Sequence, residues 1–283
     1  MLRIAIQAKG RLFEETMNMF AESSIKIEPS KRTLLVPAKN FPIEVLFLRD
    51  DDIPQVVASG IADVGVVGEN EYVERRQKAN IVKRLDFSKC RLSLAIPKAE
   101  NYEGVRWFEG KRIATSYPSI LRDFLKKNNV HADIYEITGS VEISPAIGVA
   151  DCIFDIVSSG STLVSNNLKE VEVVMNSEAL LIGHKGLSKE KQDILDELLF
   201  RFESYKNAEG KKYIILNIPN DKIAEACQLL PGMKSPTITP LFDKGWSSMQ
   251  SVIEEESFWD KISQLKAIGA EGILVLPIEK MIL

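Results

Sequence analysis

The chain has 283 residues, of which 45% are hydrophobic and 27% charged, so we expect a soluble globular protein with more than one domain. Lys and Arg number 36 against 40 Asp and Glu, which gives a net charge of −4 and argues against a general nucleic-acid binder. This balance still allows a local basic pocket for a small polyanion, and no apolar run is long enough to span a bilayer.

The cysteines and the first residues of the chain favour a cytoplasmic location. Cys90, Cys152 and Cys227 are far apart and show no metal-binding spacing, which favours free thiols over a disulfide framework. The first ten residues lack the long apolar segment that secretory signals carry. We therefore expect a protein that works in the cytoplasm without a membrane partner.

The N-terminal part alternates short apolar strands with helices. Leu2 to Gln7 predicts a first strand, and a helix is expected from Leu12 to Glu22. Between them, Lys9 and Arg11 lie in a turn at the carboxyl end of the strand, where ligands of α/β proteins often bind. The alternative is that both are solvated loop charges. Further strands are expected over residues 33–37, 43–48, 62–68, 81–85 and 90–97, with a helix through Val56, Val57 and Ile61.

The middle of the chain continues this alternation. A strand is expected over residues 111–115, a helix over 119–127, a strand over 134–137 and a helix over 145–149. Tyr117, at the end of the first of these strands, could stack on a purine or simply pack in the core.

The most informative stretch runs from Asp151 to Leu163. An apolar, β-branched segment, Cys152 to Val157, predicts a buried strand, and five small or hydroxylated residues follow it. Such a turn at a strand end can bind phosphate through hydroxyl and backbone N–H groups. Asp151 and Asp155 precede the turn and could hold ribose hydroxyls or Mg²⁺, which suggests a ribose 5-phosphate site. The simpler interpretation is an ordinary connection between a strand and a helix.

The C-terminal part predicts a separate small domain. Strands over residues 170–175 and 179–182 and a long amphipathic helix over 188–207 lead to a boundary at Ala208 to Gly210. The remaining segments follow the order β-α-β-β-α-β of a ferredoxin-like unit. Small units of this kind often bind regulatory amino acids, although the fold alone does not establish it.

Several of these segments together resemble the ATP phosphoribosyltransferase family, the enzymes of the first step of histidine biosynthesis. Gly10-Arg11-Leu12, the Arg49 to Pro54 stretch and the Ala62 to Gly68 strand match its N-terminal pattern, as does Arg91. Pro231 to Thr237 and Ala267 to Ala270 resemble the regulatory domain of its long form. The signature itself is matched by Glu142, Gly148, Asp151, Asp155, Ser159, Gly160, Thr162 and Leu163.

The resemblance implies an α/β protein with a bilobed, periplasmic-binding-protein-like catalytic part and a C-terminal ferredoxin-like (βαββαβ) regulatory domain. The expected domains are residues 1–95 with 168–206, residues 96–167, and residues 211–283. The implied reaction transfers the phosphoribosyl group of 5-phosphoribosyl diphosphate to N1 of ATP and releases diphosphate. The implied partners are ATP, 5-phosphoribosyl diphosphate, Mg²⁺, histidine as feedback inhibitor, AMP, and further copies of the chain in a dimer or hexamer.

The resemblance also assigns roles to individual residues. The catalytic set is Asp151, Asp155 and Glu142, and Asp151 and Asp155 are the expected Mg²⁺ ligands. The expected residues for 5-phosphoribosyl diphosphate are Ser158, Ser159, Gly160, Ser161 and Thr162. Those for ATP are Lys9, Arg11, Arg49, Asp63, Arg91 and Tyr117. Those for histidine are Asn217, Met233, Ser235 and Gly272.

Two alternatives stay open at this point. The same bilobed plan serves solute-binding proteins and effector domains, although neither an export signal nor a DNA-binding helix-turn-helix is evident. The second alternative is a phosphoribosyltransferase that acts on another base, because the Asp151 to Leu163 stretch would contact only the sugar phosphate and not the base. His131 and His184 have no spaced partner, and no set for acyl transfer is present.

Overall fold

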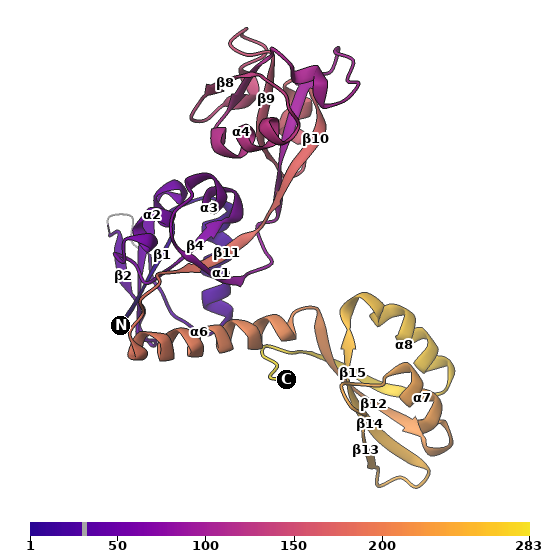
Figure 1. Cartoon of the computed structure of the whole chain (residues 1–283). Coiled ribbons are helices and arrows are strands. Elements are labelled where there is room, and N and C mark those ends of the chain that lie inside the picture. Colours follow the sequence, from indigo (N-terminus) through magenta and orange to yellow (C-terminus); the bar gives the residue numbers. More distant parts are fainter. Residues whose placement is uncertain (30–32) are drawn as a thin grey trace. The chain divides into compact units, whose positions relative to one another are not determined.

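The computed structural model describes residues 1–29 and 33–283 (Figure 1). It divides into two compact units, Met1–Ala21 with Ile25–Leu195 and Glu22–Ser24 with Asp196–Leu283. No helix among these described residues has both the length and the apolar character needed to cross a membrane.

The first unit contains a six-stranded sheet in the order β2-β3-β1-β4-β11-β5. Its strands are β1 (Leu2–Gln7), β2 (Leu35–Pro37), β3 (Ile43–Leu48), β4 (Val64–Gly68), β5 (Asn80–Arg84) and β11 (Ala179–Gly183). Its helical segments are α1 (Arg11–Glu22), η1 (Asp50–Asp52), α2 (Ile53–Ala58) and α3 (Glu69–Arg75). Because β1 is parallel to both β3 and β4, the carboxyl ends of these three strands lie at one edge of the sheet.

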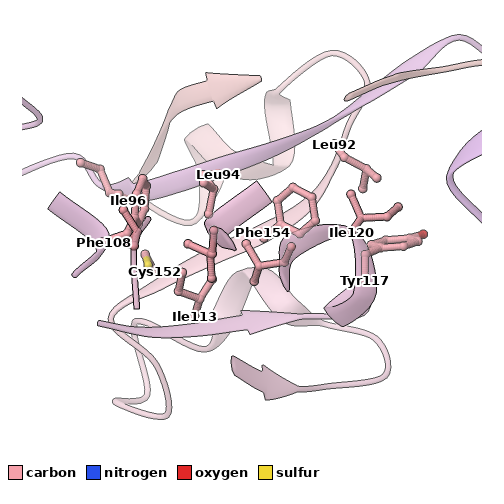
Figure 2. Packing of buried hydrophobic residues seen from close by; sticks show 12 residues of the cluster. Leu92, Leu94, Ile96, Phe108, Ile113, Tyr117, Ile120, Cys152 and Phe154 are labelled. Atoms are coloured by element: carbon pink, nitrogen blue, oxygen red, sulfur yellow. The ribbon is translucent and has the colours of Figure 1, made fainter. Parts of the chain in front are cut away.

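A five-stranded sheet in the order β10-β6-β9-β7-β8 forms the other part of this unit. Its strands are β6 (Cys90–Pro97), β7 (Arg112–Thr115), β8 (Asp133–Glu136), β9 (Cys152–Val157) and β10 (Leu168–Ser177). Its helical segments are η2 (Val105–Phe108), α4 (Pro118–Lys127), η3 (Val141–Ile143) and α5 (Ser161–Ser165). Alternate strand residues such as Leu94, Ile113 and Phe154 are fully buried and pack together on one face (Figure 2).

β6 and β10 belong to the five-stranded sheet, although the expected ranges 1–95 with 168–206 group most of their residues with the first lobe. β10 pairs with β6, and β6 pairs with β9. The six-stranded sheet takes its strands from Leu2–Arg84 and Ala179–Gly183, and the five-stranded sheet from Cys90–Ser177. The predicted domain boundaries themselves, 1–95 with 168–206, 96–167 and 211–283, stay a prediction.

The helix predicted over residues 145–149 is wrong. The structure has the short 3-10 segment η3 and then consecutive turns up to Val149. Gly148 has a φ of 77°, a left-handed value that ends a right-handed helix, so this short segment cannot continue.

The second unit contains the predicted ferredoxin-like order, which is confirmed. After α6 (Lys189–Ala208), the elements are β12 (Lys211–Pro219), η4 (Asn220–Lys222), α7 (Ile223–Leu229), β13 (Thr237–Pro240), β14 (Trp246–Glu254), η5 (Glu255–Ser257), α8 (Phe258–Ala267) and β15 (Glu271–Pro277). The four strands form an antiparallel sheet in the order β13-β14-β12-β15. Ile214, Leu216 and Met249 are buried with residues of α7 and α8 in one core.

Candidate functional site

The predicted phosphate loop follows β9 directly. Gly160 has a φ of 81°, which glycine adopts easily, and it precedes the short helix α5. The hydroxyl groups of Ser159 and Ser161 lie 3.0 Å apart, and the side chains around them are exposed. The loop therefore presents several hydroxyl groups and backbone amides at the end of one strand, an arrangement that suits a phosphate group.

Arg11 reaches this loop from the first residue of α1. Its Nη1 atom donates a hydrogen bond to the Ser158 hydroxyl at 3.2 Å, across 147 positions of the sequence. Its Nε atom pairs with Glu15 at 3.2 Å, one turn further along α1. The structure thus brings a predicted ATP-binding cation together with the first residue of the predicted phosphoribosyl loop.

Asp155 lies on β9 directly before this loop, and its carboxyl group is largely buried. Burial raises the pKa of Asp155 to about 6, and the nearby Glu142 carboxylate acts in the same direction. A hydrogen bond of 2.8 Å from the Ile156 backbone N–H opposes this rise. Glu142 belongs to η3, so two of the three predicted catalytic carboxylates do lie near each other.

Asp151 lies at the opposite end of β9 from the loop. Arg112 holds it by an ion pair of 2.8 Å and by a backbone N–H hydrogen bond of 2.9 Å, and these contacts lower the pKa of the Asp151 carboxyl group. Four residues of extended strand span about 13 Å, so Asp151 and Asp155 are too far apart to hold one ion. The geometry supports a structural role for Asp151.

This separation bears on the expected Mg²⁺ site. Within residues 1–29 and 33–283, no group of three or more His, Cys, Asp or Glu side chains is arranged to hold a metal ion. Mg²⁺ is usually held by one or two carboxylates together with substrate phosphates. The pair of Asp151 and Asp155 does not fit a shared Mg²⁺, and Asp155 is the one predicted ligand that lies beside the loop.

Lys9 and Arg49 follow β1 and β3 at the same edge of the six-stranded sheet. The two strand ends are joined by a hydrogen bond of 2.8 Å from the Ala8 N–H to the Leu48 carbonyl. Both side chains are on exposed or half-exposed turns, and Arg49 pairs with Asp51 at 3.2 Å. These two cations therefore share an edge with Arg11.

Asp63 lies at the other end of its strand, away from this edge. It precedes β4 and accepts hydrogen bonds from the Arg3 backbone N–H at 2.9 Å and from Lys191 at 2.8 Å. These contacts tie β4 to β1 and to α6. The structure does not bring Asp63 to the other predicted ATP residues.

Tyr117 is buried in the core of the five-stranded sheet, with 6% of its surface exposed (Figure 2). Its hydroxyl accepts a hydrogen bond of 3.1 Å from Asn70 of α3. Burial and the nearby Glu71 raise the pKa of Tyr117 well above its usual value. The packing alternative therefore has the better geometric support, because the ring has no free face for a purine.

A second contact from α3 lies next to Tyr117. The buried Glu74 carboxylate accepts hydrogen bonds from the backbone N–H groups of Ser119 at 2.8 Å and Ile120 at 2.9 Å. These amides belong to the first turn of α4, whose N-cap residue Tyr117 makes no side-chain capping hydrogen bond. Glu74 therefore serves as the anion for that helix start.

Arg91 forms an ion pair with Glu170, a residue that the sequence did not indicate as part of the site. Its Nε and Nη2 atoms pair with the two oxygens of Glu170 at 2.5 and 2.6 Å, and Nη1 donates to the Ser158 carbonyl at 3.1 Å. Ser93 also donates to Glu170, at 2.6 Å. The signal in the sequence was a polar alternation, Arg91 and Ser93 in one strand and Glu170 and Glu172 in another, within otherwise apolar segments.

The residues predicted to bind the inhibitor histidine lie at two places in the second unit. Asn217 of β12 lies against Gly272 of β15, because a Cβ atom at Gly272 would come within 3.0 Å of the Asn217 side chain. Gly272 also has a φ of 60°, so another residue would be strained there. Met233 and Ser235 lie in the loop between α7 and β13, and Met233 is exposed.

Two family models match the chain in succession. A model described as ATP phosphoribosyltransferase matches residues 49–204, and one described as HisG, C-terminal domain, matches residues 208–280. The chain is 67% identical over 283 residues to the ATP phosphoribosyltransferase of Phocaeicola vulgatus, and 68% identical over 282 residues to that of Bacteroides thetaiotaomicron, with 100% of each chain covered. It is 58% identical over 281 residues to that of Cytophaga hutchinsonii, covering 99% of this chain and 98% of the relative.

Solved structures agree with the bilobed fold. A chain of the ATP phosphoribosyl transferase (HisG:HisZ) complex from Thermotoga maritima superposes with a TM-score of 0.61 and 26% identity, covering 72% of this chain and 99% of that one. The substrate binding protein of an amino acid ABC transporter superposes with a TM-score of 0.50 and 12% identity, covering 73% and 93%. The second likeness concerns the fold alone, and it agrees with the predicted periplasmic-binding-protein-like architecture.

Proposed function

The chain belongs to the ATP phosphoribosyltransferase family of histidine biosynthesis, and from this premise we propose the reaction that its site performs. N1 of the adenine ring of ATP attacks C1 of 5-phosphoribosyl diphosphate. The N1–C1 bond forms while the C1–O bond breaks, and the electron pair leaves with diphosphate. The product is N1-(5-phosphoribosyl)-ATP.

The chemistry of this transfer needs little from an acid or a base. N1 of adenine is neutral and carries a lone pair, so no proton has to be removed before attack. The barrier lies in the cationic character that develops at C1 as diphosphate departs. Positioning of the two substrates and stabilisation of that charge should therefore supply most of the catalysis.

The proposal assigns these tasks to the residues around the β9 loop. The Ser158 to Thr162 loop holds the 5-phosphate, and Lys9, Arg11 and Arg49 balance the phosphates of both substrates. Asp155, with Glu142 beside it, provides negative charge next to the sugar. The observation that carries the proposal is the 3.2 Å contact between Arg11 and Ser158, which joins a cation of the ATP edge to the phosphoribosyl loop.

We assign Mg²⁺ to the donor substrate and not to a protein site. When bound to the diphosphate, the ion neutralises the charge of the leaving group. Asp155 is the protein carboxylate that could contact it there, since Asp151 is held by Arg112 at the far end of β9.

Histidine feedback inhibition belongs to the proposal as well. The ferredoxin-like unit would bind histidine, with Asn217 and Gly272 as neighbouring pocket residues and Met233 and Ser235 as candidates from the adjacent loop. AMP as a ligand of the ATP site and a homo-oligomer, dimer or hexamer, complete it. The sequence of a relative that is 67% identical over its whole length supports a shared overall organisation.

The proposed reaction is tested by incubating the protein with ATP, 5-phosphoribosyl diphosphate and Mg²⁺ while the ultraviolet absorbance of the N1-substituted adenine is followed. Turnover should need all three components, and GTP should not replace ATP. Histidine should slow the reaction. An unchanged absorbance, with both substrates recovered intact, would exclude the reaction and favour the solute-binding alternative.

A variant of Arg11 tests the residue assignment within the same assay. Arg11→Gln should raise the KM for 5-phosphoribosyl diphosphate by about tenfold or more, because a charge-assisted contact to a phosphate-binding loop is lost. Arg106→Gln is the matched control, since Arg106 is an exposed arginine of η2 that pairs with Glu109 at 3.9 Å. Equal KM values for both variants would remove Arg11 from the site.

A further inference from the structure

The ion pair between Arg91 and Glu170 lies beside the Ser158 to Thr162 loop, and the proposed reaction assigns no task to it. The two residues belong to β6 and β10, which are antiparallel neighbours. Nε and Nη2 of Arg91 contact the two Glu170 oxygens at 2.5 and 2.6 Å, so the guanidinium and carboxylate planes meet through two parallel contacts. This two-pronged geometry fixes the orientation of Arg91 as well as its charge.

Ser93 extends this pair towards the catalytic carboxylate. Its hydroxyl donates to Glu170 at 2.6 Å, and Ser93 is fully buried. Ser93 is also the direct partner of Asp155 across the antiparallel pair of β6 and β9. Glu170 thus anchors the two β6 residues that lie opposite the end of β9.

The third donor of Arg91 reaches the loop itself. Nη1 donates to the Ser158 carbonyl at 3.1 Å, and Arg91 is paired in register with Val157, the last residue of β9. Ser158 is therefore held from two sides, by Arg91 at its carbonyl and by Arg11 at its hydroxyl. Both contacts therefore converge on the first residue of the loop.

These contacts bear on the alternative that Arg91 binds ATP. Each of its three guanidinium nitrogens has a protein partner, and 32% of the side chain is exposed. A phosphate of ATP could bind Arg91 only by displacing Glu170 or the Ser158 carbonyl. The arrangement suits a residue that orients the protein backbone better than one that binds a nucleotide.

We propose that Glu170 and Arg91 form a positioning pair that holds the start of the phosphoribosyl loop in its binding conformation, with Ser93 orienting the Glu170 carboxylate. The inference rests on the proposed function of that loop. Neither residue touches the reacting atoms. Their effect is to keep Ser158 and the hydroxyl groups after it aligned for the 5-phosphate before the donor arrives.

The kinetic test compares Glu170→Gln with a matched variant on the same strand. Glu170→Gln removes the charge that orients Arg91, so the KM for 5-phosphoribosyl diphosphate should rise about 10- to 100-fold while the KM for ATP is unchanged. Glu172→Gln makes the same substitution two residues away, where the carboxylate accepts a hydrogen bond from Tyr102 at 2.5 Å. This control should leave both KM values as in the unaltered protein.

A double variant shows whether the two residues act as a unit. Arg91→Gln and Glu170→Gln together should raise the KM for 5-phosphoribosyl diphosphate no more than Arg91→Gln alone, because that single change already removes both the ion pair and the contact to the Ser158 carbonyl. If Arg91→Gln instead raises the KM for ATP and Glu170→Gln does not, Arg91 is a nucleotide ligand and the positioning role is overturned. Ser93→Ala is the milder variant to use if Glu170→Gln does not fold.

Hydrogen exchange of the free protein gives a readout that does not depend on activity. Backbone amides of residues 158–163 should exchange at least tenfold faster in Glu170→Gln than in Glu172→Gln, with melting temperatures that differ little. Equal exchange rates would overturn the positioning role even in a fully active enzyme. Conversely, faster exchange in a protein without phosphoribosyltransferase activity would refute the proposed function and leave the pair's effect on the loop established.

Discussion

Replacing Asp155 by Asn should lower turnover by at least about 100-fold and at the same time stabilise the folded protein at neutral pH. The carboxylate is buried, and burial raises its pKa from 3.8 to about 6. Asn is uncharged but keeps an oxygen that can accept the hydrogen bond from the Ile156 N–H. The variant therefore removes the charge that the proposed reaction needs and, with it, the free-energy cost of burying that charge.

The expected size follows from the pKa difference. A rise of about two in pKa corresponds to about 3 kcal/mol of unfavourable free energy for the ionised form in the folded state. Between pH 4 and 6 the unfolded chain has lost the Asp155 proton while the folded protein keeps it, so the unaltered protein loses stability as pH rises through this range. At pH 7.5, the free energy of unfolding of Asp155→Asn should be about 1–3 kcal/mol higher than that of the unaltered protein. At pH 4 this difference should nearly vanish.

Urea unfolding followed by circular dichroism at the two pH values measures this difference, and the absorbance assay measures a loss of turnover of at least about 100-fold. Asp151→Asn is the matched control, at the residue just before β9, and its effect on stability should have the opposite sign. Arg112 lowers the pKa of Asp151, so this carboxylate contributes stability above pH 4 that is lost as the pH falls. Asp151→Asn should destabilise the protein at pH 7.5 and make little difference at low pH.

Two results would refute this reasoning. A stability difference for Asp155→Asn that is the same at pH 4 and pH 7.5 would show that the burial of charge is not its cause. Full turnover by the variant would remove Asp155 from the proposed site, whatever its effect on stability.

Three further predictions concern other parts of the chain. In the unaltered enzyme, kcat should fall as the pH drops below about 6, because Asp155 becomes protonated, and Asp155→Glu should keep a profile of the same shape; a flat profile would contradict the charge role. Glu74→Ala should lower the free energy of unfolding, measured with urea, by about 1–2 kcal/mol, because the first turn of α4 loses its cap. Glu136→Ala changes an exposed position on β8 and should alter this free energy little. Asn217→Ala should weaken histidine inhibition about tenfold in the absorbance assay without changing the rate in the absence of histidine; unchanged inhibition would place the effector pocket elsewhere.

The parts of the site that could be predicted from the sequence are those built from neighbouring residues. An apolar run rich in β-branched residues, followed by Ser158 to Thr162, predicts a strand and then a loop. The structure has β9 at this run, followed by the loop and the short helix α5. The prediction that Asp151 and Asp155 act together rested on their spacing in the sequence. In a strand, residues four apart share a face but lie about 13 Å from each other, so the two aspartates could not share a site once β9 was a strand.

Other features depend on contacts between distant segments, and local patterns carry little information about those. Tyr117 packs in the core of the five-stranded sheet and α3 brings Asn70 to its hydroxyl, and nothing near Tyr117 in the sequence indicates the contact with Asn70. Glu170 is 79 residues from Arg91, and the register of β6 and β10 places it opposite Ala95, so the two side chains meet only through the folded sheet. The polar alternation in both strands could mark them as unusual but could not identify their partner.

Glu74 also affects where an anion can bind at the edge of the five-stranded sheet. β7 and β9 are parallel, so the segments that follow them, which begin α4 and the Ser158 to Thr162 loop, open at the same edge of the sheet. Each could attract an anion, but the amides of α4 are already taken by a carboxylate that the protein itself provides. Glu74 therefore occupies the start of α4, and in the proposed reaction the sugar phosphate would bind at the Ser158 to Thr162 loop instead.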